Sequence, residues 1–496
     1  MSHAPVKRRP VSARAATDYT PGSYPATTVP SAPMLHLLDR FSYGATPDLV
    51  AEATKAGGQQ AWFQTQISYG VDATAKSVAQ WWPDLNRSPI ELFRRNAYHV
   101  RPAWAVMMDY VNRTLTRRII SPRPLVEVMQ EFFEHHLHVP LGADLAFCYR
   151  PQYGDLIRAN CLGRFEDMLV GALNNPAMLL YLNAINSEKT HPNENLAREL
   201  LELHTVGVGN YSESDVKNAA RLMTGFTINV NTGALTYKTS AHDTSPVTVG
   251  SFSDPNANPD GRAAYTAMLR YLANHPDTAR RIATKMVVRF VSDDAPAALV
   301  DKLTAVYLAN GTAIVPMLQA LVSSDEFAAS AGRKLRDPAE DLVVAMRRLG
   351  ATFSRPLLAK SPANLLCNVA AAMGLIPYTW PSPDGQPLVG AAWATPSRAA
   401  ASLQVHTRMA TLSYPATVYP RASSFLPPLP IAFKDLVDHL HRRIHQRPSD
   451  ARALQACCEA TGVAPTDSIT TKHTVVTSGF ATLLGTLLDL PPTFQR

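Results

Sequence analysis

The chain has little cysteine and no long hydrophobic run. Its 496 residues include five cysteines, which form no Cys-x-x-Cys pair and no zinc-type spacing. The sequence therefore predicts neither a disulfide framework nor a cysteine-based metal site. No window approaches the ~18 consecutive apolar residues of a membrane span. The Arg8-Arg9 pair has no apolar segment behind it, so the N-terminus lacks the pattern of a secretory signal and predicts a cytoplasmic protein.

The motifs of several common enzyme classes are also missing. The chain has no GxSxG nucleophile elbow, no Walker loop, no HExxH zinc motif and no GxGxxG opening a helix. A ferritin-like di-iron bundle needs two helices that each carry Glu-x-x-His. Here that spacing occurs from Glu188 to His191 and runs into Pro192, so we do not expect such a bundle.

The composition indicates a folded protein with a substantial core, since 46% of residues are hydrophobic and 18% are charged. Helical periodicity dominates, and the predicted fold is mostly α: a single large multi-helix domain with a short β-hairpin insertion. The hairpin is expected to pair strands Leu235 to Thr239 and Val247 to Ser251. Residues 1–32 are rich in Pro, Ser, Thr and Ala and are predicted to be disordered. The helical domain spans 33–496, with sub-lobes at 33–350 and 351–496 as an alternative division.

The net charge of +7 is mildly basic for this length. The most basic tract runs from Pro89 to just beyond Thr116. It carries six arginines, namely Arg94, Arg95, Arg101, Arg113, Arg117 and Arg118. We expect a solvated arginine face there, because no aromatic–basic pattern or known nucleic-acid module accompanies the tract. Binding of nucleic acid is the less favoured alternative, and the sequence identifies no other partner.

The clearest helix start lies at Asn193, a good N-cap, followed by Glu194 at the positive end of the helix. Leu196, Leu200 and Leu203 then recur on one face, the pattern of a helix packed on a core. His204 lies on this leucine side. Glu199 and Glu202 lie opposite.

A second helix, Pro124 to Val139, carries three histidines. Its polar face is predicted to hold Glu127, Glu131, Glu134, His135 and His138. His136 falls on the apolar face. A buried histidine is either satisfied structurally or serves as a ligand, and both interpretations stay open. His441 and His445 also have helical i,i+4 spacing, but arginines separate them, so we expect a solvated pair.

Several segments resemble the bacterial family catalogued as "domain of unknown function 1800". The longest is NENLARELLELHTVGVGNYSESDVKNAARLMTGFT, from Asn193. Others are HLLDRFSYGATP from His36, FFEHHLHV from Phe132 and IATKMVVRFVSDDAP from Ile282. Weaker echoes are the Trp380 to Trp393 segment and the closing PPTFQR, so the resemblance covers residues 36 to 496.

The resemblance implies family membership but no established reaction. His136 corresponds to the histidine of the family's Trp-x-Asn-His-Phe motif, although the Trp and Asn positions differ here. The family also has a His-Asp pair where this chain has His242-Asp243, which adds His242 to the candidate residues. Relatives are often exported, so the missing leader departs from that pattern.

Together these residues predict a site assembled between helices. His136, His204 and His242 are the candidate ligands of one transition-metal ion, either zinc, copper or iron. Glu199 and Glu202 are the candidate catalytic acid/base groups. On a regular helix His204 lies about 140° from Glu199 and about 200° from Glu202, so neither carboxylate is expected to share an ion with it.

Three functional hypotheses follow. The first is a metal-dependent enzyme of unknown reaction with this interhelical site. The second is a non-catalytic helical scaffold or binding protein whose buried histidines are satisfied by the fold. The third, less favoured, is nucleic-acid binding through the basic tract. The Pro- and Gly-rich segment 377–397 is in addition a candidate lid.

Overall fold

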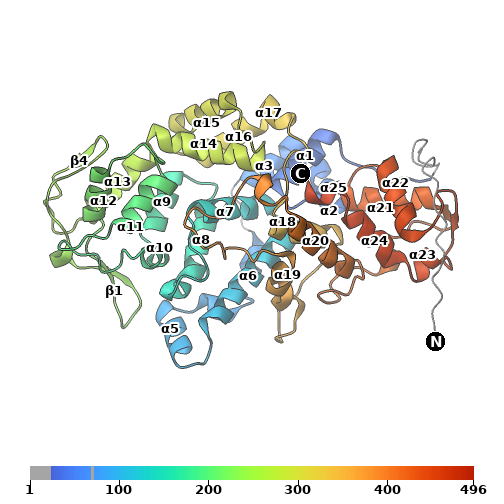
Figure 1. The fold of residues 1–496 in the computed structure, drawn as a ribbon, viewed down its shortest axis with the longest axis horizontal. Coiled ribbons are helices and arrows are strands. Elements are labelled where there is room, and N and C mark those ends of the chain that lie inside the picture. The colour runs from blue at the N-terminus through green and yellow to red at the C-terminus, as the bar shows by residue number, and fades with distance from the viewer. Residues whose placement is uncertain (1–23, 69–71) are drawn as a thin grey trace.

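The computed structural model describes residues 24–68 and 72–496. Figure 1 shows an elongated, mostly helical molecule with two β-hairpins at one end. The strands of the described residues form three small two-stranded antiparallel sheets, so the predicted mostly α fold is confirmed. In the same part of the chain, no helix is both long and apolar enough to cross a bilayer.

The first part of the chain forms helices whose starts are set by prolines and capping side chains. Thr46 accepts a hydrogen bond from the Leu49 amide with Pro47 at the first helical position, as predicted. The helices are α1 (Ala32–Phe41), α2 (Pro47–Lys55), α3 (Gln59–Ile67), α4 (Ala73–Val78), α5 (Pro89–Ala97), α6 (Ala103–Ile120), α7 (Pro124–His136) and α8 (Arg150–Asn160).

The middle of the chain forms the hairpin end and the helices beside it (Figure 1). Asn193 caps α11, and Ser212 forms a capping box with Asp215 at the start of α12, as their spacing predicts. The elements are α9 (Phe165–Leu173), α10 (Pro176–Tyr181), α11 (Glu194–Glu199), the π-helical turn η4 (Leu200–His204), α12 (Glu213–Leu222), α13 (Arg262–Ala273), α14 (Pro276–Phe290), α15 (Ala297–Ala309), α16 (Ile314–Val322) and α17 (Asp325–Ala328).

The last part of the chain returns to the N-terminal helices. A bridge joins Leu335 to Gln495, and Arg336 pairs with Asp39 of α1. The elements are α18 (Pro338–Arg348), α19 (Leu366–Met373), α20 (Pro396–Met409), β5 (Ile431–Ala432), α21 (Phe433–His445), α22 (Ala451–Thr461), β6 (Ser468–Ile469), α23 (Thr474–Thr477), α24 (Phe480–Leu488) and α25 (Pro491–Phe494).

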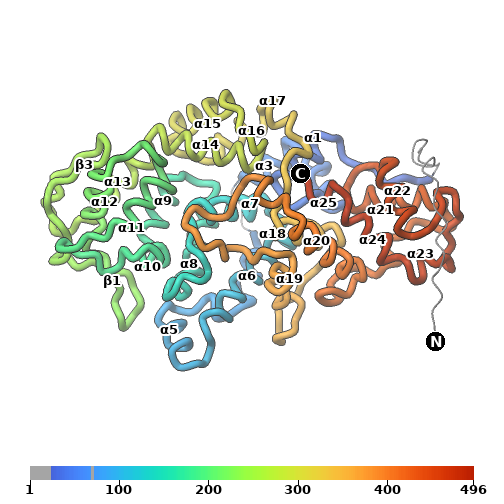
Figure 2. The backbone as a smooth tube through the Cα atoms, viewed as in Figure 1, coloured from blue at the N-terminus to red at the C-terminus, as the bar shows by residue number. Residues whose placement is uncertain are grey.

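One continuous apolar core runs through the molecule, with members from Met34 to Leu490. The smooth trace in Figure 2 shows the orange segment that follows α19 passing over α7 and α8, two helices that are distant from it in sequence. The core residues of both halves of the chain thus belong to one cluster. The division into sub-lobes at residue 350 stays a prediction.

The hairpin prediction was wrong in its pairing. β2 (Leu235–Tyr237) pairs with β1 (Phe226–Ile228), and β3 (Val247–Val249) pairs with β4 (Phe252–Asp254). Each predicted strand therefore pairs with a neighbour closer in sequence, because a short turn closes at a lower entropy cost than a long loop.

The basic tract is not a solvated face along its whole length. Pro102 separates α5 from α6, and the arginines in the second half of α6 are buried. Arg113 pairs with Asp155, and Arg118 pairs with Glu131 at 2.7 Å. A buried arginine keeps its charge only when a carboxylate compensates it, so these side chains stabilise the interior.

The predicted polar face of α7 is also buried, together with its apolar face. Its carboxylates serve the internal ion pairs: Glu134 pairs with Arg150, and Glu127 with Arg158. The expectation of a solvated His441/His445 pair was likewise wrong. Both rings are buried, and their centroids lie 4.7 Å apart.

Part of the segment predicted to be disordered packs against the fold. The Tyr24 hydroxyl donates to Asp438 of α21 at 2.6 Å, and Arg442 donates to the carbonyl of Thr27. Residues 1–23 of that prediction lie outside the described residues.

Candidate functional site

Two histidines from different helices face each other at the centre of the molecule. His136 ends α7 and His204 ends the π-helical turn, and their ring centroids lie 6.2 Å apart. The His136 Nε2–H donates to the carbonyl of His204 at 3.1 Å, and the His204 Nδ1–H donates to the carbonyl of His136 at 2.9 Å. Because a carbonyl only accepts, these reciprocal bonds fix the tautomer of each ring. The unprotonated nitrogens are His136 Nδ1 and His204 Nε2.

Lys285 of α14 occupies the first of these nitrogens. Its Nζ donates to His136 Nδ1 at 3.0 Å. Burial and the nearby charge of Arg281 lower the pKa of Lys285 to about 7. The side chain is half-buried, and its hydrogen bond is to an imidazole nitrogen, not to a carboxylate. With this pKa, a substantial fraction of the amine is unprotonated at pH 7.

The second nitrogen, His204 Nε2, is buried and has no hydrogen-bond partner within the described part of the chain. Burial, with the charges of Lys285 and Arg281, lowers the pKa of His204 to about 3. Burial and the charge of Lys285 also hold the pKa of His136 well below its usual range. Both imidazoles are therefore neutral at physiological pH. The lone pair of His136 Nδ1 accepts from Lys285, and that of His204 Nε2 has no partner in the described residues.

Arg281 lies one turn before Lys285 on α14 and fixes the π-helical turn from the other side. Its Nε donates to the carbonyl of Leu203 at 2.9 Å. Gly207, with φ of +93°, lets the guanidinium pass, since a Cβ there would lie 3.0 Å from Nη1. Helix α14 therefore supplies two contacts to the site: Lys285 donates to His136, and Arg281 donates to the turn that ends at His204.

The angular estimate for Glu199 and Glu202 assumed a regular helix, but Leu200–His204 forms a π-helical turn, in which the backbone hydrogen bonds span five residues instead of four. The Thr205 hydroxyl donates to the Leu200 carbonyl at 2.6 Å and closes the turn. Such turns occur frequently at functional sites. That neither carboxylate shares an ion with His204 stays a prediction.

Glu199 and Glu202 are both half-buried. Burial, together with the charge of Glu202, raises the pKa of Glu199. Glu202 accepts a hydrogen bond from the Tyr211 hydroxyl at 2.7 Å. Burial and the charges of Glu199 and Asp384 raise the pKa of Tyr181 to about 12.

The segment predicted as a lid lies over α7. His138 Nε2 bonds to the carbonyl of Trp380 at 2.8 Å, and the Tyr181 hydroxyl donates to the carbonyl of Pro381 at 3.2 Å. At Gly385, with φ of +76°, a Cβ would lie 2.1 Å from the carbonyl oxygen of His135, so only glycine allows this approach. Asp384, exposed on the same segment, is close enough to Lys285 to favour its ammonium form.

His242 does not join the other two histidines through any contact. It is buried on the hairpin side, where Nδ1 lies 3.2 Å from the carbonyl oxygen of Thr224 and Nε2 lies 3.0 Å from Asn256 Oδ1. Its neighbour Asp243 pairs with Arg221. Its Nε2–H can donate to Asn256 Oδ1 while Nδ1 lies 3.2 Å from the Thr224 hydroxyl, so each ring nitrogen has a polar neighbour in the fold.

Within residues 24–68 and 72–496, no group of three or more His, Cys, Asp or Glu side chains is arranged to hold a metal ion. The three histidines proposed as ligands are therefore not gathered around one point. Metal binding itself stays a prediction.

Sequence reasoning missed Lys285. The residue stands in the family-like segment IATKMVVRF, where it is a single lysine among apolar side chains. The helix carries several other charged residues, including Arg280, Arg281 and Arg289, so local composition did not single out this lysine. Its partner His136 lies 149 residues away in the sequence, so the pairing could not be predicted from a local pattern.

These features define a class: a mostly helical protein with a neutral lysine–histidine cluster beneath an ordered loop. A family model described as "Protein of unknown function (DUF1800)" matches residues 36–496, and the chain belongs to this family. Neither the curated proteins nor the solved structures gave a match.

Proposed function

We propose that the protein is an enzyme in which the amine of Lys285 attacks the carbonyl carbon of its substrate. The supporting observation is the position of this amine, 3.0 Å from an imidazole nitrogen. A lysine with a pKa lowered toward 7 is the usual nucleophile in imine formation.

The proposed step is balanced by groups at the site. The Lys285 nitrogen forms a bond to the carbonyl carbon, and one of its protons passes to the carbonyl oxygen, which becomes a hydroxyl. The nitrogen gives its second proton to a carboxylate, the hydroxyl takes a proton from a carboxylic acid and leaves as water, and the carbon–nitrogen double bond of an imine remains. His136 Nδ1 accepts a hydrogen bond from the amine and orients it. Glu199 and Glu202 stay the proposed acid/base groups, and the raised pKa of Glu199 suits delivery of a proton to the leaving hydroxyl.

Reductive trapping tests this proposal without knowledge of the substrate. The protein is incubated at pH 7.5 with short aldehydes or 2-oxo acids and cyanoborohydride, and each lysine is quantified by peptide mass analysis. We expect Lys285 to be modified at least ten-fold faster than Lys302, an exposed lysine of α15. Lys285→Met removes the modified peptide, and Lys302→Met leaves it unchanged. Equal rates for the two lysines would exclude the amine as a special nucleophile.

A metal centre is the second candidate, and one observation favours it separately. The N–H groups of His136 and His204 both donate to peptide carbonyls, which is the support that metal-ligating histidines usually have. Each ring then presents a lone pair. Zinc, copper or iron would bind these two nitrogens, with Glu199 or Glu202 as further oxygen ligands, after movement of the side chains.

Lys285→Met distinguishes the two candidates, because the hydrogen bond from Lys285 occupies the lone pair of His136 Nδ1 that a metal ion would need. A metal centre predicts that this variant binds Zn²⁺ or Cu²⁺ more tightly, in a 1:1 ratio, and that His204→Asn abolishes the binding. The amine mechanism predicts that the variant loses trapping and gains no stoichiometric metal. Titration calorimetry and metal analysis of dialysed protein supply the measurement.

A further inference from the structure

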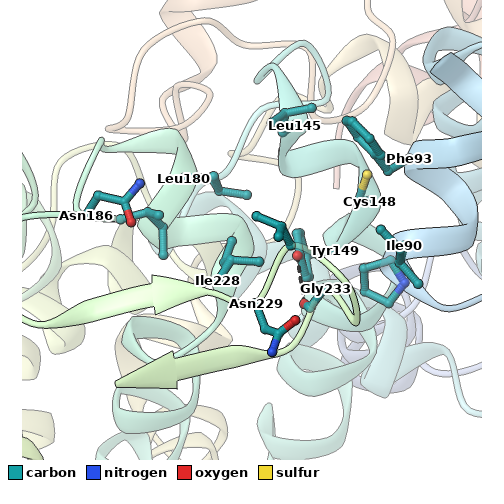
Figure 3. Close-up of a pocket in the computed structure, with 13 residues that line it drawn as sticks. Ile90, Phe93, Leu145, Cys148, Tyr149, Leu180, Asn186, Ile228, Asn229 and Gly233 are labelled. Atoms are coloured by element: carbon teal, nitrogen blue, oxygen red, sulfur yellow. Dashed lines mark hydrogen bonds between the residues drawn. The ribbon is translucent and has the colours of Figure 1, made fainter. Parts of the chain in front are cut away.

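A separate apolar cavity of about 300 Å³ lies on the hairpin side of the molecule. Figure 3 shows its walls: α5 with Phe93, the turn that carries Leu145 and Cys148, Leu180 of α10, and the β1–β2 hairpin with Ile228. Four segments from different parts of the chain thus enclose it. None of the residues discussed at the lysine–histidine cluster lines it.

The cavity contains no charged side chain. Burial raises the pKa of the Cys148 thiol to about 12, so the sulfur is a neutral apolar group. The Tyr149 hydroxyl is already used, since it donates to the carbonyl of Gly233 at 2.8 Å. A charged ligand would lose its hydration in this cavity without compensation.

Two amide groups supply the polar character. Asn186 Oδ1 accepts from the Thr227 hydroxyl at 2.7 Å, and Asn229 Oδ1 accepts from the Asn231 amide at 2.9 Å. Their oxygens are thus engaged, and their NH₂ groups remain as donors. Figure 3 shows both amides on the hairpin side, away from Phe93 and Leu145.

The rim exposes apolar surface that a ligand would cover. Phe93 is 42% exposed, Leu145 is 40% exposed and Val230 is 81% exposed. A cluster of such side chains around a cavity marks a binding site more often than a chance surface.

We infer that this cavity binds an uncharged, largely apolar molecule that carries one hydrogen-bond-accepting oxygen. A cavity of about 150 Å³ holds one benzene ring, so this one suits two fused rings or a medium-length alkyl chain. The apolar body packs on the Phe93 side, and the oxygen accepts from the asparagine amides. This inference does not depend on the chemistry of Lys285.

The test uses N-phenyl-1-naphthylamine, a neutral fluorescent probe, with the full chain. We expect saturable binding at one site and displacement by 1-decanol. Decanoate at pH 8 should displace the probe at least ten-fold less well, because no cation lines the cavity. Displacement by decanoate as strong as that by decanol would overturn the assignment of an uncharged ligand.

Two variants locate the bound probe. Leu180→Trp fills the cavity and is expected to weaken binding at least ten-fold. Val230→Asp charges an exposed rim position without disturbing the core and is expected to weaken it about three- to ten-fold. Leu403→Trp changes a 43%-exposed leucine on α20 and serves as the matched control. Binding that is non-saturable, or that neither cavity variant weakens, would show that the probe lies elsewhere and would overturn the inference.

Discussion

His136 and His406 are both buried histidines on helices, yet their neighbours make the first neutral and the second positively charged. His136 faces the amine of Lys285, and its pKa is held well below the usual range. His406 of α20 lies between two carboxylates, with Nε2 3.1 Å from Asp341 and Nδ1 2.9 Å from Asp489. Although burial opposes it, the charge of Asp341 raises the pKa of His406 to about 9.

The difference separates a structural histidine from one suited to chemistry. An imidazolium ion between carboxylates has both nitrogens engaged and offers nothing to a ligand. In the neutral pair, His204 Nε2 keeps a lone pair with no partner in the described residues, and the lysine that donates to His136 Nδ1 can lose a proton near pH 7. Equal burial therefore says little about the role of a histidine, because the neighbouring charges determine whether its nitrogens remain available.

The largest expected effect is on the charged cluster. Asp341 accepts from Ser402 and pairs with His406 and with Arg398 at 3.1 Å. Asp341→Asn leaves these cations without their partner, so the free energy of unfolding should fall by about 3–5 kcal/mol. Urea unfolding at pH 7 measures it. Asp301→Asn, at a site 61% exposed, is the control and should cost less than about 0.5 kcal/mol. A loss for Asp341→Asn no greater than this would mean that the ion pairs of Asp341 contribute little to stability.

The same cluster should make stability depend on pH in a defined window. The pKa of His406 is raised in the folded protein from 6.5 to about 9, so its contribution is complete below pH 6.5 and is lost as the pH rises through 9. The difference in unfolding free energy between wild type and His406→Gln should therefore shrink by on the order of 2–3 kcal/mol over this window. Urea unfolding of both proteins at pH 6, 7.5 and 9 checks it. Groups common to both proteins cancel, and a difference that does not vary with pH would contradict the charged assignment.

Local signals in the sequence predicted much of the fold. Prolines and capping residues placed the starts of α2, α11 and α12, because these depend on neighbours within one turn. The predicted solvated faces of α6 and α7 were wrong. Periodicity separates the polar side of a helix from its apolar side, but it cannot show that other helices cover both sides. Whether Arg118 is exposed to solvent or pairs with Glu131 depends on how the helices pack, and a short stretch of sequence does not contain that information.

The candidate site was predicted in part for the same reason. Apolar periodicity indicated that His136 and His204 point inward, and the structure brings them together. The π-helical turn was not predictable from a 3.6-residue period, and Lys285 was missed because its partner is distant in sequence. His242 was selected by resemblance alone, and each of its ring nitrogens has a polar neighbour in the fold.

His242 extends the comparison as a third buried histidine, and its packing can be tested without changing it. A Cβ at Gly261 would lie 2.1 Å from His242 Nε2, although the backbone there suits any residue. Gly261→Ala should lower the free energy of unfolding by about 1–3 kcal/mol through overpacking. Gly142→Ala is the matched control, since a Cβ there meets nothing within 4 Å. Equal stability of the two variants in thermal unfolding would show that the His242 ring moves freely.

The smallest expected effect tests the origin of the neutral lysine. The cation of Arg281 lowers the pKa of Lys285, and the anion of Asp384 raises it. Arg281→Met should therefore raise that pKa, and Asp384→Asn should lower it, each by about 0.5 to 1. Competitive acetylation of Lys285 between pH 6 and 10, normalised to Lys302, measures both values. At pH 7 the first variant should react more slowly than wild type and the second faster. Opposite signs identify charge as the cause. A change of the same sign in both would instead reflect access of the reagent, because either substitution removes a side chain near the amine.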